Sequence, residues 1–163
     1  MNKSVPFFDY PRLFKDEEGP LLDLITEVGR RGAFIMQEDL RKFEVNLAKY
    51  TKSSFAIGVA NGTDALELAL TAVGLSRGDE VICCSHTMLA TASAIKLVGG
   101  TPIPVELGDD NLIDPDAVAD AINDKTVGIM PTQLNGRTCD MDKLNAIAEQ
   151  NGLFIVEDAA QGL

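Results

Sequence analysis

The sequence predicts an α/β protein, with a three-layer α/β/α arrangement around a mostly parallel sheet that this chain leaves incomplete. Short apolar runs alternate with helix-forming segments of about 8–12 residues, which is typical of parallel strands joined by right-handed crossovers. The runs are apolar throughout and do not alternate with polar residues, as expected of strands in a sheet that is covered on both faces.

Five apolar runs are predicted to be parallel strands: Phe55–Val59, Val81–Cys84, Thr101–Val105, Thr126–Met130 and Leu153–Val156. Each of the first four leads into a segment predicted to be a helix, namely Ala65–Val73, Thr87–Val98, Pro115–Ile122 and Asp140–Gln150. The order strand, turn, helix therefore recurs along the chain without an intervening linker or repeat.

Residues 1–50 are predicted to form an N-terminal arm and helices, and residues 51–163 to form part of a larger α/β domain. Met1–Lys15 contains prolines and aromatic residues, which favour an extended arm lying on another surface over a helix. Apolar residues at helical spacing then predict one helix that starts at Pro20 and a second over Gln37–Lys49.

Composition excludes several classes of function. The 163 residues include 25 acidic and 14 basic side chains, a net charge of -11, which opposes binding to nucleic acid or to an anionic membrane. No apolar run approaches the roughly 20 residues of a membrane span, and Met1–Phe8 lacks the features of a signal peptide, so a cytoplasmic location is expected. The three cysteines are expected to be free, and with His86 as the only histidine no metal site is predicted.

Two polar segments are candidates for a binding site. Asn61-Gly62-Thr63 follows the first predicted strand and opens a helix, so its N–H groups could bind a phosphate, although these residues could also serve only as a helix cap. Asp158 ends the last predicted strand, where a buried carboxylate needs a cationic partner, backbone N–H groups or a metal ion. Gln161 could supply an amide donor beside it. Both segments lie at the carboxyl end of the predicted sheet, and pyridoxal phosphate has a phosphate and a basic ring nitrogen suitably placed to join them.

These segments belong to a wider set of motifs that resembles one protein family. The set comprises Gly32–Phe34, Phe43-Glu44, Leu47–Tyr50, Asn61–Leu66, Gly78–Ile82, Thr87–Ala92, Gly99–Pro102, Asn135-Gly136, Asp140–Asp142 and Val156–Gln161. In this order and separation they resemble the DegT/DnrJ/EryC1/StrS sugar aminotransferases, which have the aspartate-aminotransferase fold and use pyridoxal 5'-phosphate.

The resemblance implies a role for each matching residue. Gly62 and Thr63 would contact the cofactor phosphate, Asp158 would hold the pyridine nitrogen protonated, and Gln161 would lie near the ring hydroxyl. Met88 occupies the position where the family usually stacks an aromatic side chain on the cofactor ring, and it departs from that pattern. His86 could stack instead, but an ordinary solvent-facing histidine is the simpler interpretation.

The resemblance also implies that residues needed for catalysis are missing. Family members are roughly twice as long, and their Schiff-base lysine lies beyond the segment that matches Val156–Gln161. Lys96, Lys125 and Lys143 do not match that lysine. The chain is therefore expected to be an N-terminal portion without catalytic residues of its own. In the family fold the first strand pairs with the last, so Phe55–Val59 would lack its usual neighbour.

The implied function is that of a pyridoxal-phosphate-dependent aminotransferase that moves an amino group from a donor such as glutamate to a keto sugar, expected to be nucleotide-linked. The protein would be a homo-oligomer, and this chain would be inactive alone because the lysine is absent. The alternative is a non-catalytic α/β interaction module that dimerises or docks on a full-length relative. A receiver-like or flavin-binding domain has less support, because the first strand lacks the acidic pair or hydroxyl-rich loop that those domains need.

Overall fold

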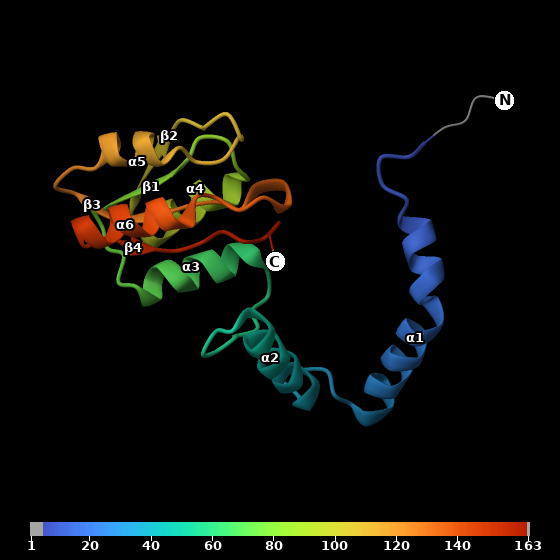
Figure 1. The fold of residues 1–163 in the computed structure, drawn as a ribbon. Coiled ribbons are helices and arrows are strands. Elements are labelled where there is room, and N and C mark those ends of the chain that lie inside the picture. The colour runs from blue at the N-terminus through green and yellow to red at the C-terminus, as the bar shows by residue number, and fades with distance from the viewer. Residues whose placement is uncertain (1–4, 163) are drawn as a thin grey trace. The chain divides into compact units, whose positions relative to one another are not determined.

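The computed structural model describes residues 5–162. These residues form two compact units, one ending at Gly58 and the other beginning at Val59. Figure 1 shows the helices and strands of both units.

The first unit contains two helices, α1 (Tyr10–Arg31) and α2 (Glu38–Thr51). The prediction that Met1–Lys15 is an extended arm is wrong beyond residue 9, and residues 1–4 lie outside the described part. The Asp9 side chain accepts a hydrogen bond from the Arg12 N–H at 3.3 Å and so caps α1. Pro11 lies in the first turn, where a proline is favoured because its missing N–H has no helical partner.

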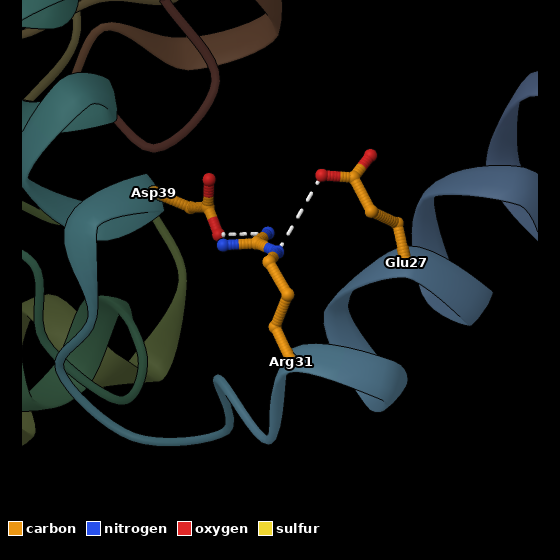
Figure 2. A network of polar contacts seen from close by, with 3 residues as sticks. All are labelled: Glu27, Arg31 and Asp39. Atoms are coloured by element: carbon orange, nitrogen blue, oxygen red, sulfur yellow. Dashed lines mark hydrogen bonds and ion pairs between the residues drawn. The ribbon is translucent and has the colours of Figure 1, made fainter.

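Pro20 lies inside α1 and does not start a helix, so the predicted start of this helix was also wrong. The second predicted helix, Gln37–Lys49, is confirmed as α2. The Arg31 guanidinium contacts Asp39 of α2 at 2.8 Å and Glu27 of its own helix at 3.4 Å. Figure 2 shows the three side chains. All three side chains are well exposed, so this ion-pair network contributes little to stability.

The predicted strand Phe55–Val59 does not form, because no strand is present beside it in the described residues and its backbone bonds elsewhere. The Gly58 N–H donates to Glu44 Oε1 at 2.8 Å, which ties the segment to α2. A side chain at residue 58 would lie 2.6 Å from Leu40 Cδ1, so the segment approaches α2 closely. Phe55 remains 83% exposed.

The second unit is built on a parallel sheet of four strands in the order β2-β1-β3-β4. Its strands are β1 (Glu80–Cys84), β2 (Thr101–Val105), β3 (Thr126–Met130) and β4 (Phe154–Ile155). The helices are α3 (Gly62–Ala72), α4 (Leu89–Val98), α5 (Pro115–Ala121) and α6 (Met141–Asn151), with a short 3₁₀ turn at Leu134–Gly136. The last four predicted strands and all four predicted helices of this unit are present, although β4 is shorter than Leu153–Val156.

The sheet has a hydrophobic core on each face. On one face, α5 and α6 pack against the sheet, with Val118 and Leu144 fully buried. On the other face, α3 and α4 pack against it through Leu70 and Ile95. The predicted α/β fold class with helices on both faces of a parallel sheet is therefore confirmed.

Two further structural observations concern the predictions from composition. All three cysteines are free and buried. Among residues 5–162, none of the helices combines the length and apolar character that a membrane crossing requires.

Candidate functional site

A pocket of about 370 Å³ lies at the carboxyl ends of the strands, where ligands bind in open α/β sheets. It brings together the five residues for which the resemblance implies a cofactor contact, namely Gly62, Thr63, Met88, Asp158 and Gln161. Its lining comprises Gly62, Thr63, Leu66, Met88, Ala90, Thr132, Leu134, Asp158, Ala160 and Gln161. A wider groove of about 650 Å³ runs along α3 and α4, but none of the five selected residues lines it.

One side of the pocket is the start of α3. The Asn61 side chain accepts from the Asp64 N–H at 3.0 Å, so Asn61 does cap this helix. No acceptor is recorded within residues 5–162 for the N–H of Gly62 or Thr63. A Cβ added at Gly62 would meet no atom within 4 Å. Helix capping and anion binding are therefore compatible here, because they use different N–H groups.

The other side of the pocket carries a buried carboxylate. Asp158, only 5% exposed, follows β4 and is held through its backbone, which bonds to Pro131 O and to the Gln133 N–H at 2.9 Å each. Its Oδ2 accepts from Thr91 Oγ1 at 2.7 Å, and its Oδ1 accepts from the Ala160 N–H at 3.3 Å. In the described part of the chain, no lysine, arginine or histidine lies within ion-pair distance of this carboxylate.

Asp158 is also connected to a chain of threonine hydroxyls that sequence reasoning did not select. Thr87 Oγ1 lies 2.9 Å from both Thr91 Oγ1 and Thr132 Oγ1. Thr91 has no exposed surface, and Thr132 is buried at the end of β3. The only signal in the sequence is the spacing of Thr87 and Thr91, four residues apart and so on one face of a helical turn.

Gln161 and Met88 also line the pocket. The Gln161 Oε1 accepts from the Asn135 N–H at 2.8 Å, which commits the amide oxygen and leaves the amide nitrogen as the donor. Met88 is 66% exposed and immediately precedes α4. His86 is exposed and does not line the pocket, so the structure gives no support to a stacking role for its ring.

The residues present fit pyridoxal phosphate at both of its charged ends. The α3 N–H groups suit a phosphate, and a buried carboxylate without a cationic partner suits a protonated ring nitrogen. No lysine is among the lining residues that the structure describes. Residues 5–162 contain no cluster of three or more side chains that could hold a metal ion.

Comparison with known proteins gives matches along nearly the whole chain. It is 40% identical to dTDP-3-amino-3,4,6-trideoxy-alpha-D-glucose transaminase of Streptomyces venezuelae, over 96% of this chain and 42% of that protein. It is 38% identical to 3-oxo-glucose-6-phosphate:glutamate aminotransferase of Bacillus subtilis, over 98% of this chain and 37% of the relative.

Solved structures give the same result. The crystal structure of NtdA from Bacillus subtilis with bound cofactor PMP matches with a TM-score of 0.95 at 37% identity, over 100% of this chain and 38% of that one. The chain thus spans about two fifths of the length of these relatives.

The resemblance inferred from the motifs is confirmed by a family model that matches residues 15–163. Since that match covers the second unit and most of the first, the chain belongs to the DegT/DnrJ/EryC1/StrS aminotransferase family.

Proposed function

We propose that this chain forms the cofactor-binding part of a pyridoxal-phosphate-dependent aminotransferase that acts on a keto sugar. The observation that carries the proposal is the pocket itself, in which the buried Asp158 carboxylate and the start of α3 are lining residues of one cavity. The activities of the relatives, a dTDP-sugar transaminase and a 3-oxo-glucose-6-phosphate:glutamate aminotransferase, support a nucleotide-linked or phosphorylated keto sugar as acceptor and glutamate as donor.

Five of the lining residues have a proposed role. The N–H groups of Gly62 and Thr63 bind the phosphate, and Asp158 keeps a proton on the ring nitrogen by a charge-assisted hydrogen bond. Gln161 donates its amide N–H to the ring hydroxyl, and the Met88 thioether lies against the ring face. When bound, the cofactor supplies an electron sink for negative charge on the substrate carbon that carries the amino group.

The proposed enzyme needs more than these residues. Covalent attachment of the cofactor requires a lysine, and the absence of lysine from the described pocket lining supports the view that this residue comes from outside the chain. We infer that the chain alone does not catalyse amino transfer. We also propose that residues 1–50 form an N-terminal region outside the cofactor-binding domain, that residues 51–163 form part of that domain, and that the protein is a homo-oligomer.

Titration with pyridoxal 5'-phosphate tests the site. Asp158→Asn keeps the size of the side chain but removes the charge, so it should weaken binding roughly tenfold or more. Asp120→Asn is the matched control, because Asp120 is an exposed residue of α5 outside the pocket lining. Equal affinities of Asp158→Asn and the control would contradict the proposal.

Borohydride reduction of the loaded chain tests the missing lysine. Reduction followed by peptide mapping should show no single lysine labelled in proportion to the protein. Stoichiometric labelling of Lys96, Lys125 or Lys143 would show that the chain carries its own attachment site.

A further inference from the structure

We propose that Thr91 is a positioning residue for the cofactor site, one that aims the Asp158 carboxylate into the pocket by holding Oδ2. This inference rests on the proposed function, because it assigns the other carboxylate oxygen to the ring nitrogen. The Thr91 hydroxyl lies 2.7 Å from Oδ2, a distance typical of a hydroxyl that donates to a carboxylate.

The two carboxylate oxygens have different surroundings. Thr91 has no exposed surface and does not line the pocket, so Oδ2 faces the protein interior. Oδ1 has a single longer contact, 3.3 Å from the N–H of Ala160, and Ala160 itself lines the pocket. We therefore assign Oδ1 as the acceptor that a ligand in the pocket would reach.

Thr91 is itself held on its far side. The Thr87 hydroxyl contacts Thr91 Oγ1 at 2.9 Å and Thr132 Oγ1 at the same distance. These threonine hydroxyls connect the start of α4 to the ends of β3 and β4, and these elements meet at the pocket. Because the single Thr91 proton goes to Asp158 Oδ2, the Thr91 oxygen can only accept from Thr87, which it does when the Thr87 proton points to it and not to Thr132. Rotation of the Thr91 side chain would break the bond to Oδ2, so the direction of the Asp158 carboxylate is fixed before a ligand arrives.

Two ligands separate positioning from general support of the fold. The first, 4-deoxypyridoxine 5'-phosphate, has the ring nitrogen and the phosphate but no aldehyde, so it cannot bond covalently to any lysine. The second, benzyl phosphate, keeps the phosphate and an aromatic ring but has no ring nitrogen. Only the first ligand depends on the carboxylate of Asp158.

The experiment measures both affinities for the whole 163-residue chain and its variants. Thr91→Val replaces the hydroxyl with a methyl group of similar size and should weaken binding of the first ligand roughly tenfold, with no more than about twofold change for benzyl phosphate. Thr91→Ser keeps the donor and should restore the parent value. Thr71→Val is the matched control, since this exposed threonine of α3 donates only to Glu67 O and does not line the pocket.

The outcomes are distinguishable. Failure of the parent chain to bind either ligand would overturn the proposed function and the role of Thr91 with it. Binding of both ligands by the parent, with no selective loss in Thr91→Val, would overturn the role of Thr91 alone. Equal losses for both ligands would likewise show that Thr91 only supports the fold.

A second variant keeps the proposal testable if Thr91→Val does not fold. Thr87→Val removes the hydroxyl behind Thr91 but leaves Asp158 its direct donor. This variant should lose affinity selectively for the ligand with the ring nitrogen, but by a smaller factor of about threefold. A non-selective loss in this variant would overturn the proposal.

Discussion

The contact between Gly128 and Phe154 predicts how strongly the β3–β4 pairing depends on a glycine. The two residues are partners in the parallel register. A Cβ added at Gly128 would lie 2.1 to 2.5 Å from three atoms of the Phe154 ring, closer than any real contact. Gly128→Ala therefore forces the ring to leave its position over β3.

Two effects of opposite sign determine how much Gly128→Ala changes the stability. Overpacking of this kind destabilises a protein by about 1–3 kcal/mol. Gly128 does not have a positive φ, so alanine can adopt its backbone conformation and recovers about 0.4–1 kcal/mol through the unfolded chain. The net loss should be about 1–2 kcal/mol. The loss of stability should extend to the pocket, because Thr132 and Asp158 continue the β3–β4 pairing beyond the strands.

Amide hydrogen exchange of β3 measures the effect directly, since it reports the free energy of local opening. Phe154→Leu removes the ring, so in that background the added methyl group at residue 128 should cost much less. Coupling between the two substitutions below about 0.5 kcal/mol would refute the reasoning, because residues in such contact cannot act independently. Unchanged protection in Gly128→Ala alone would refute it equally.

Three further predictions concern the site and the core. Gly62→Ala should keep the parent stability, because its methyl group meets no atom within 4 Å, yet weaken pyridoxal phosphate binding in a titration by filling space beside the α3 N–H groups. Met88→Phe should strengthen that binding roughly two- to tenfold through ring stacking, and an unchanged Kd would remove Met88 from the ring contact. Burial raises the pKa of Cys83 from 9.0 to about 11, so between these values the folded chain keeps a proton that the unfolded chain has released. Stability should therefore fall by about 2 kcal/mol from pH 9 to 11, and denaturation curves of Cys83→Val should show a smaller slope with pH.

Local patterns were sufficient to predict the second unit. Runs such as Val81–Cys84 are buried on both faces of the sheet, so their apolar character follows directly from their position. The same reasoning failed for Phe55–Val59, since an apolar run becomes a strand only when another strand is available to pair with it. It also failed at Pro11, where a proline that suggested an extended arm instead lies in the first turn of α1.

Some residues of the site could likewise be predicted from the local sequence, whereas others depend on contacts between distant parts of the chain. Gly62 and Asp158 could be selected because each stands at a predicted strand end, and parallel topology brings such ends together. The contact of Thr91 with Asp158 joins residues 67 positions apart, and nothing in the local sequence of either indicates the other. The motif resemblance covers both segments but gives no reason for a threonine at residue 91.

The two edges of the sheet, β2 and β4, differ in the backbone hydrogen-bonding groups that are available to pair with a further strand. On β2, Thr101 and Val105 bond toward β1, so positions 102 and 104 face outward, and both are proline. Proline has no N–H to donate, so this edge cannot extend the sheet by a regular ladder. On β4, the Val156 N–H donates to Ile129 O, and the alternation of the strand turns the N–H and C=O of Ile155 away from β3. Extension of this sheet is therefore confined to the β4 side. Because Asp158 lies just beyond the carboxyl end of β4, a strand added there would lie beside the carboxylate end of the pocket.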